Sequence, residues 1–316
     1  MVVEDFPFPA FEPDRLPVAG PMDGCPTCQD PAMRTVQLPN DVSVPALGLG
    51  TWRMGESPAS HPRDVAAVRR AFELGYRLID TAEMYGDGGA ERVVGEALKG
   101  AVDAGVLRRE DVFLVTKVMP GNASRKGTIA ACERSVQRLG VDYVDLFLLH
   151  WRGPRPLEET VAAFESLSER GLVRSWGVSN FNVADLDELW RLPAGSHCVA
   201  NQVYYSASER GIEFDLLPAH RQRRLATMAY CPIDQGALAS DATFAEIGQR
   251  HGVTAAQAAL AWVLRQPDVV AIPKAGREQH LRDNLAAAQL TLSERDLAAV
   301  DARYAPPARK QRLAMT

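Results

Sequence analysis

The chain alternates between short, almost uninterrupted apolar runs and longer stretches in which apolar and polar residues mix. A short apolar run is typical of a parallel strand that is buried on both faces. We predict strands over residues 46–49, 77–79, 112–116, 144–149, 175–178, 199–202, 226–229 and 269–272.

The mixed stretches between these runs repeat with the period of an α-helix. Val65, Val68 and Phe72 fall at positions i, i+3 and i+7, and residues 157–167 show the same spacing. Thr254 and Gln257 have the spacing of a capping box, which predicts that a helix begins there. A helix is therefore expected after each strand.

Strands that alternate with helices predict an α/β fold, a (β/α)8 TIM barrel, formed as a single domain by residues 34–316. A doubly wound open sheet has the same order of elements and remains the alternative. No Gly-x-Gly-x-x-Gly segment follows any predicted strand, which speaks against a Rossmann dinucleotide site.

The beginning of the chain does not share this pattern. Residues 1–33 contain seven prolines and no periodicity, so we predict an irregular extension. After it, residues 35–38 and 42–44 flank Pro39-Asn40-Asp41 and are predicted to form a small hairpin.

Composition excludes several classes of protein. The net charge is −5 and no block of Lys or Arg occurs, which argues against nucleic-acid binding. No apolar run approaches the roughly 20 residues that cross a bilayer, and the N-terminal residues do not resemble a secretory signal. We therefore expect a cytoplasmic protein that acts as a monomer on a small molecule.

The five cysteines, at positions 25, 28, 132, 198 and 231, support a reducing compartment because their number is odd and three fall in predicted core segments. Cys25 and Cys28 have the spacing of half a zinc site or of a redox pair. No second Cys/His pair accompanies them, so we interpret them as incidental and predict no metal site.

Polar groups follow nearly every predicted strand. They are Asp80, Lys117, His150, Ser179, Asn180, Gln202 and Tyr230. In a β/α barrel the C-terminal ends of the strands converge on one face, where active sites form. These side chains are therefore expected to meet in one pocket, together with Tyr85, which lies five residues after Asp80.

Four of these residues suit the reduction of a carbonyl group. That reaction delivers a hydride to carbon and a proton to oxygen, so it needs an acid that works near neutral pH. Tyr85 ordinarily has a pKa of about 10. We expect the ammonium group of Lys117, held by Asp80, to lower that pKa, and His150 to orient the carbonyl oxygen.

The chain resembles the aldo-keto reductase superfamily, and the motifs that carry the resemblance occur in family order between residue 35 and about residue 305. They are Gly50-Thr51-Trp52, Asp80-Thr81-Ala82-Glu83-Met84-Tyr85-Gly86, Thr116-Lys117, Leu149-His150-Trp151, Gly177-Val178-Ser179-Asn180-Phe181, Asn201-Gln202-Val203 and Ile272-Pro273-Lys274. Small bacterial members that reduce compounds such as methylglyoxal are the most similar.

The resemblance implies a role for each matching residue, with NADPH as cofactor. Asp80, Tyr85, Lys117 and His150 would be catalytic, and Trp52 and Trp151 would line the substrate pocket with Tyr85 and His150. Tyr230 would stack on the nicotinamide ring, whose carboxamide would bind Ser179, Asn180 and Gln202. The remaining cofactor residues would be Gly50, Thr51, Asp80, Cys231, Pro232, Ile233, Ile272, Lys274, Arg277, His280 and Asn284.

The sequence departs from the family at the phosphate end. Lys274 matches a lysine that meets the adenosine 2′-phosphate, but Ala275 replaces a common hydroxyl residue and His280 replaces a common arginine. Cys231 replaces a frequent serine, and Asp234 places a carboxylate in the loop that covers the pyrophosphate. Weaker selectivity for NADPH over NADH is expected.

Two alternatives to a reductase remain on the same fold. The first is a regulatory subunit that binds NADPH without turnover. The second is an aldolase in which Lys117 forms a Schiff base with the substrate.

Overall fold

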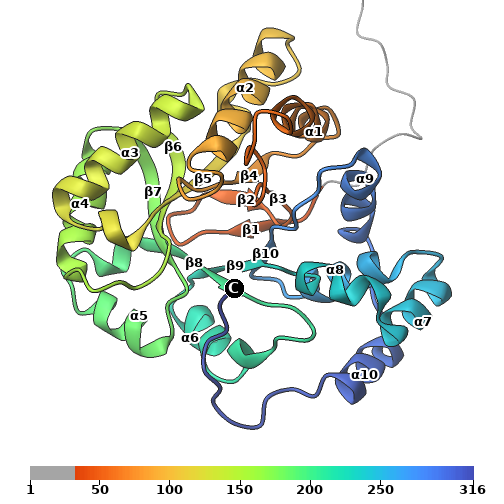
Figure 1. The fold of residues 1–316 in the computed structure, drawn as a ribbon. Coiled ribbons are helices and arrows are strands. Elements are labelled where there is room, and N and C mark those ends of the chain that lie inside the picture. Colours follow the sequence, from red (N-terminus) through yellow and green to blue (C-terminus); the bar gives the residue numbers. More distant parts are fainter. Residues whose placement is uncertain (1–32) are drawn as a thin grey trace, which may run out of the picture. The chain divides into compact units, whose positions relative to one another are not determined.

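The computed structural model describes residues 33–316, and these form a closed barrel of parallel strands surrounded by helices (Figure 1). The eight strands are β3 (Leu49–Gly50), β4 (Leu78–Asp80), β5 (Phe113–Val118), β6 (Val144–Leu149), β7 (Val173–Ser179), β8 (Cys198–Tyr204), β9 (Ala226–Tyr230) and β10 (Val269–Ala271). Each predicted run overlaps one of them.

The first and last strands close the barrel. The amide of Gly48 donates to the carbonyl of Ala271 at 2.9 Å, and the amide of Ala271 donates to that of Ala46 at 2.8 Å. Near the other end, the amide of Gly50 donates to the carbonyl of Pro273 at 3.1 Å. The TIM barrel is confirmed, because an open doubly wound sheet would leave these two edges apart.

Helices cover the outside of the strands. They are α1 (His61–Glu73), α2 (Gly89–Asp103), α3 (Arg125–Leu139), α4 (Leu157–Glu169), α5 (Val183–Trp190), α6 (Leu216–Gln222), α7 (Ala242–His251), α8 (Ala255–Leu264), α9 (Glu278–Ala287) and α10 (Glu294–Arg303). Between β9 and β10 two helices, α7 and α8, follow each other, and α10 is added after the last strand–helix unit.

The predicted apolar faces account for this packing. Val65, Val68 and Phe72 of α1 are buried, as the periodicity indicated. Burial of each such side chain stabilises the folded state by about 1.5–3 kcal/mol relative to leaving it in water. At the start of α8, the hydroxyl of Thr254 accepts from the amide of Gln257 at 3.2 Å and the carboxamide of Gln257 accepts from the amide of Thr254 at 2.9 Å, which confirms the capping box.

The predicted hairpin closes the end of the barrel where the strands begin. Its strands are β1 (Thr35–Gln37) and β2 (Ser43–Pro45), and their inward residues Val36 and Val44 are buried. The side chain of Asn40 donates to the hydroxyl of Ser175 in β7 at 2.9 Å. The hairpin does not cover the opposite end of the barrel, where the strands finish and where the predicted functional groups lie.

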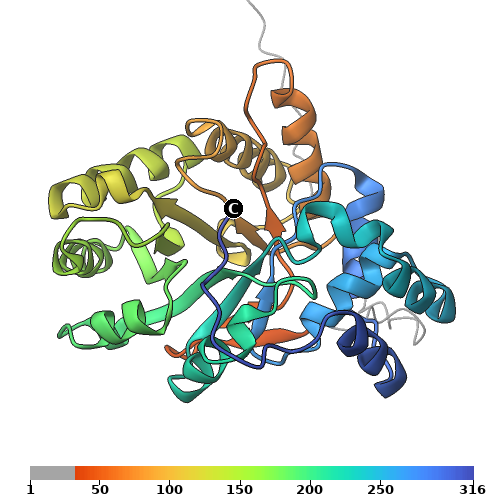
Figure 2. The ribbon, with the colours of Figure 1, turned by 60° about the horizontal axis from the view of Figure 1, so that its bottom comes forward.

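The last residues of the chain run across that functional end (Figures 1 and 2). Leu313 packs against the core, and Lys310 forms an ion pair with Asp215 at 3.1 Å.

Several expectations lie wholly or partly outside the described residues. The irregular extension predicted for residues 1–33 and the cysteine pair at 25 and 28 lie there, apart from Met33, which packs on the core. Across residues 33–316 no helix is long and apolar enough to cross a membrane. The same residues contain no cluster of three or more His, Cys, Asp or Glu side chains arranged to hold a metal ion.

Candidate active site

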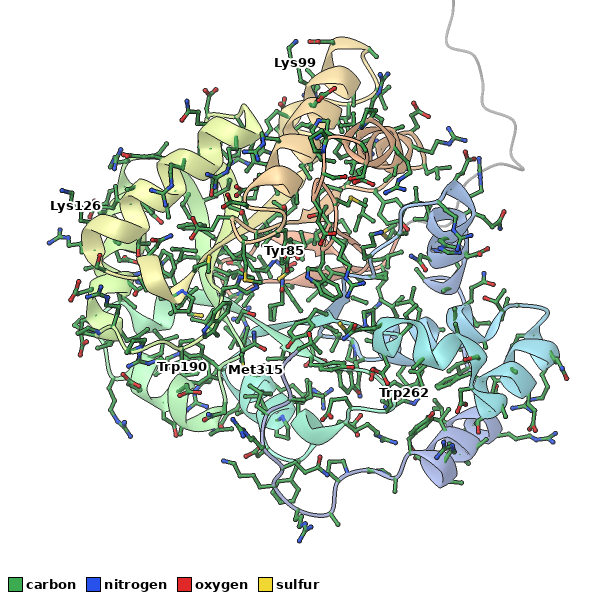
Figure 3. All side chains as sticks on the ribbon, in the orientation of Figure 1. Tyr85, Lys99, Lys126, Trp190, Trp262 and Met315 are labelled. Carbon is green, nitrogen blue, oxygen red and sulfur yellow. The ribbon has the colours of Figure 1, made fainter. Side chains whose placement is uncertain are left out.

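A cavity of about 420 Å³ opens at the C-terminal ends of the strands. Tyr85 lies near the centre of the view along the barrel (Figure 3), and both Tyr85 and Met315 line the cavity. Most of the predicted site residues line this cavity: Gly50, Trp52, Asp80, Tyr85, His150, Trp151, Ser179, Asn180, Gln202, Tyr230, Cys231, Pro232, Ile233, Ile272, Lys274 and His280.

Four predicted residues lie outside the wall of the cavity. Thr51 is buried and its hydroxyl donates to the carbonyl of Asp80 at 3.0 Å. Lys117 lies buried beneath the wall. Arg277 is exposed immediately before α9, and the side chain of Asn284 hydrogen-bonds the hydroxyl of Tyr76.

Lys117 is the centre of the polar network. It projects from β5 and is completely buried, and its ammonium group donates to Asp80 Oδ2 at 2.7 Å and to the carbonyl of Thr81 at 2.7 Å. The hydroxyl of Tyr85 lies 3.4 Å from the same nitrogen. All three protons of the ammonium group therefore have an oxygen within reach, and a buried charge requires such a set of partners.

The expected lowering of the Tyr85 pKa is wrong for this structure. Burial raises the pKa of the Tyr85 phenol well above its ordinary value, and the nearby carboxylate of Asp80 raises it further. The physical reason is that burial penalises the charged phenolate, while the ammonium group of Lys117 lies 3.4 Å from the phenol oxygen and is closer to Asp80, at 2.7 Å. Tyr85 therefore holds its proton firmly at neutral pH.

His150 is held as a neutral ring. Burial and the ammonium group of Lys117 lower the pKa of His150 to about 3, so the imidazole carries no charge at neutral pH. Its ring packs edge-on against Tyr85, with centroids 5.8 Å apart. Its Nδ1 atom is buried and has no hydrogen-bond partner among the described residues. A neutral imidazole can orient an oxygen atom, but it is not an acid in this setting.

The amide side chains of Gln202 and Asn180 hydrogen-bond to residues on other strands around the cavity. The carboxamide of Gln202 donates to Asp80 Oδ1 at 2.7 Å, so both carboxylate oxygens of Asp80 have partners. Asn180, which adopts a left-handed backbone with φ 59°, donates to the carbonyl of His150 at 3.1 Å and accepts from the hydroxyl of Tyr230 at 2.8 Å. Asn180 also donates to the hydroxyl of Ser179, which donates to the carbonyl of Gln202, so groups from β4 to β9 form one connected network.

Several lining residues were missed by sequence reasoning: Arg53, Met84, Gln235, Gly236, Pro273, Met315 and Thr316. Met84 and Pro273 lie inside predicted motifs, and Arg53, Gln235 and Gly236 lie within three residues of predicted site residues, so closeness in sequence was the available signal. Met315 and Thr316 reach the cavity through the path of the C-terminal segment (Figure 1). Thr316 hydrogen-bonds the side chains of Tyr230 and Cys231.

Comparison with known proteins places this geometry in a family. The model of the aldo/keto reductase family matches residues 46–305. Methylglyoxal reductase YeaE of Escherichia coli (strain K12) is 49% identical over 287 residues, which cover 89% of this chain and 99% of that protein. Glyoxal reductase of Bacillus subtilis (strain 168) is 34% identical over 268 residues, covering 85% and 92%.

A solved structure agrees in fold as well as in sequence. The aldo-keto reductase from Klebsiella pneumoniae, crystallised in complex with NADPH, is 47% identical and superposes with a TM-score of 0.85 over 90% of this chain and 99% of that one. The family model spans the barrel from before its first strand to beyond α10, and the relatives match almost end to end. This chain therefore belongs to the aldo/keto reductase family.

Proposed function

We propose that this protein is an NADPH-dependent reductase of small aldehydes and ketones. The observation that carries the proposal is the contact of Lys117 with both Asp80 and Tyr85 at the base of a cavity whose wall also holds neutral His150. The names of the relatives support a carbonyl substrate, and the NADPH complex of the Klebsiella enzyme supports the cofactor.

The residues of the cavity fit a nicotinamide nucleotide. Gly50 lines the cavity and lets the backbone of residues 272–274 approach closely, because a Cβ atom there would lie 2.8 Å from the carbonyl oxygen of Ile272. Ser179, Asn180 and Gln202 would hold the carboxamide, whose one acceptor and two donors match hydroxyl and amide partners. Tyr230 would stack on the ring. Lys274, Arg277, His280 and Asn284 would face the adenosine 2′-phosphate and the adenine.

The reaction needs a hydride and a proton. NADPH supplies the hydride to the carbonyl carbon. Tyr85 donates its proton to the carbonyl oxygen, and Lys117 stabilises the phenolate that remains, at 3.4 Å in the structure. The raised pKa of Tyr85 does not prevent this transfer, because the alkoxide that forms as hydride arrives is a stronger base than a phenolate. The neutral ring of His150 orients the oxygen towards Tyr85.

The substrate class follows from the walls of the cavity. Trp52, Met84 and Met315 are among the exposed large apolar residues, and all three line it. The segment between β6 and α4 is short, so the site is proposed to favour small reactive carbonyls such as methylglyoxal. Arg152, which lies between β6 and α4, is paired with Glu188 at 2.8 Å and does not line the cavity.

The direct test of the proposed function compares kcat/KM for methylglyoxal and for a steroid ketone, with NADPH oxidation as the readout. We expect turnover of methylglyoxal and a clear preference for it over the steroid. A preference for the steroid would contradict the assignment to small substrates. Binding of NADPH without turnover of any small carbonyl would instead support the regulatory subunit.

The Schiff-base aldolase has a separate test. Lys117 is fully buried, is charged by contact with Asp80, and does not line the cavity, so it is badly placed to attack a carbonyl. We expect borohydride to trap no adduct with methylglyoxal or another small carbonyl, as measured by the intact mass of the protein. A mass increase that disappears in Lys117→Met would support the aldolase.

The pH dependence follows from the pKa directions. With the pKa of His150 at about 3 and that of Tyr85 raised, neither group changes its charge between about pH 5 and 8, so kcat/KM for reduction is expected to be flat there. Burial lowers the pKa of Lys117, so activity should fall as the pH rises towards that lowered pKa and then towards the raised pKa of Tyr85, because the ammonium charge and the phenol proton are then lost. An acid-side decrease near pH 6.5, the ordinary pKa of histidine, that vanishes in His150→Asn would contradict this.

Cofactor selectivity is expected to depend on Lys274. We expect Lys274→Ala to lower kcat/KM with NADPH by up to about tenfold, because the lysine is exposed and its attraction is screened, and to leave the value with NADH unchanged. Lys99→Ala is the matched control, since Lys99 lies at the periphery of the molecule (Figure 3). An equal loss with both cofactors would remove Lys274 from contact with the 2′-phosphate.

We also propose that the protein works as a monomer in the cytoplasm. Support for the cytoplasm comes from the cysteines of the described region, because Cys132, Cys198 and Cys231 are all free thiols. Burial raises the pKa of Cys132 and of Cys198 to about 12, which keeps both thiols protonated and unreactive.

A further inference from the structure

The loop that follows β9 has an unusual backbone. Cys231, Asp234 and Gln235 all adopt left-handed conformations, with φ values of 49°, 50° and 50°, and Gly236 follows at 100°. A residue other than glycine is strained in this region, and the strain persists only where the surroundings hold it. The loop also forms one wall of the cavity, through Cys231, Gln235 and Gly236 among others.

Asp234 supplies the contacts that hold the loop. One carboxylate oxygen accepts a hydrogen bond from the hydroxyl of Tyr204, at the end of β8, and the other accepts from the hydroxyl of Ser208 at 2.9 Å. We call Tyr204, Ser208 and Asp234 the clasp. Asp234 is not among the residues that line the cavity, so its charge is directed away from the place proposed for an anionic cofactor.

The clasp also reaches the ring proposed to stack on nicotinamide. Tyr204 is buried and its ring stacks on Tyr230, with centroids 5.5 Å apart and planes inclined by 27°. Tyr230 lines the cavity and Tyr204 does not, so Tyr204 supports the face of Tyr230 that points away from it. Tyr230 is held at its other end by its hydrogen bond to Asn180.

We propose that Asp234 is a positioning residue for the cofactor. Through Tyr204 it fixes both the strained loop of residues 231–236 and the ring of Tyr230, and so sets how tightly and for how long NADPH stays bound. This inference rests on the proposed function, because it requires NADPH to lie against Tyr230 and the loop. A negative charge that acted directly on the phosphates of NADPH would weaken its binding. The proposed role is the opposite, because here the carboxylate strengthens binding of the cofactor.

The direction in which Asp234→Ala changes the affinity for NADPH distinguishes these two roles. If the charge of Asp234 repelled the cofactor, Asp234→Ala would tighten NADPH binding. If the clasp positions the loop, the same change weakens binding and speeds dissociation. We expect an increase of about tenfold in both Kd and the dissociation rate, which corresponds to the loss of a hydrogen bond to a charged group.

The experiment measures NADPH binding and stopped-flow dissociation by fluorescence of the full chain. Tyr204→Phe keeps the stacked ring and the carboxylate but removes the hydroxyl, so it should weaken binding in the same direction, and the double variant should be no worse than Asp234→Ala. Asp234→Asn keeps an acceptor and tolerates a left-handed backbone, so it should bind within about threefold of the wild type. Glu246→Ala, an exposed charge removed on α7, is the matched control.

The outcomes are distinct. Two results would contradict the clasp if the wild type binds NADPH and reduces methylglyoxal. One is unchanged or tighter NADPH binding in Asp234→Ala, and the other is fully additive losses of NADPH affinity in the double variant. Failure of the wild type to bind NADPH would overturn the proposed function itself. If Asp234→Ala does not fold, the Kd for NADPH is compared between Tyr204→Phe and Asp234→Asn. Equal Kd values in these two variants would contradict the clasp.

Discussion

Replacement of Tyr85 by Phe is expected to lower kcat for methylglyoxal by about 10²–10⁴-fold, the range that general acid catalysis contributes. The phenol is the one group at the cavity that combines a proton held at neutral pH with contact to Lys117 at 3.4 Å. His150 does not replace it, because its lowered pKa keeps the ring neutral, and the single N–H of a neutral imidazole is a very weak acid. NADPH binding should persist, since the phenol is not among the groups proposed to hold the cofactor.

The measurement is the single-turnover rate of NADPH oxidation, together with NADPH binding by fluorescence. Tyr143→Phe is the matched control, because Tyr143 packs against Arg109 and Arg174 and does not line the cavity. Turnover of Tyr85→Phe within tenfold of the wild type would remove Tyr85 from the role of acid.

Replacement of Lys117 by Met is expected to abolish most activity and also to destabilise the protein. Without the ammonium group the phenolate left by proton transfer has no cation beside it, so the rate should fall by orders of magnitude. Asp80 would remain buried without its ion-pair partner, which costs about 3–5 kcal/mol of unfolding free energy when one member of a buried pair is removed. Denaturant unfolding measures the second effect.

A second variant separates the two effects. Asp80→Asn combined with Lys117→Met removes the unpaired charge and still offers Gln202 an acceptor, so it should recover most of the stability and none of the activity. Recovery of turnover in the double variant, or an unchanged pH–rate profile in the single one, would show that Lys117 supports only the fold.

The barrel could be predicted from the sequence because its signals are local. Nearly continuous apolar runs such as residues 144–149, in which Asp145 is the one polar residue, identify buried parallel strands, and β6 has those bounds in the structure. The alternation of strands and helices then leaves few topologies. Convergence of Asp80, Lys117 and His150 on one face follows from the topology alone, since each lies at or just after the end of its strand.

The remaining features depend on contacts between distant segments. The pKa of Tyr85 is set by how deeply the ring is buried and by which oxygen is closest to Lys117, neither of which spacing reveals. The position of Met315 in the cavity depends on the path of the chain after α10. The orientation of Asp234 is decided by Tyr204, thirty residues earlier in the sequence.

The central claim is that these residues hold NADPH with one face towards a carbonyl and deliver a proton from Tyr85. The most direct test uses NADPH deuterated in turn on each of the two faces at nicotinamide C4, with methylglyoxal as substrate and mass spectrometry of the alcohol. The account predicts stoichiometric alcohol that carries deuterium on the new carbinol carbon from only one of the two labelled cofactors. Absence of alcohol, or deuterium delivered equally from both faces, would contradict it.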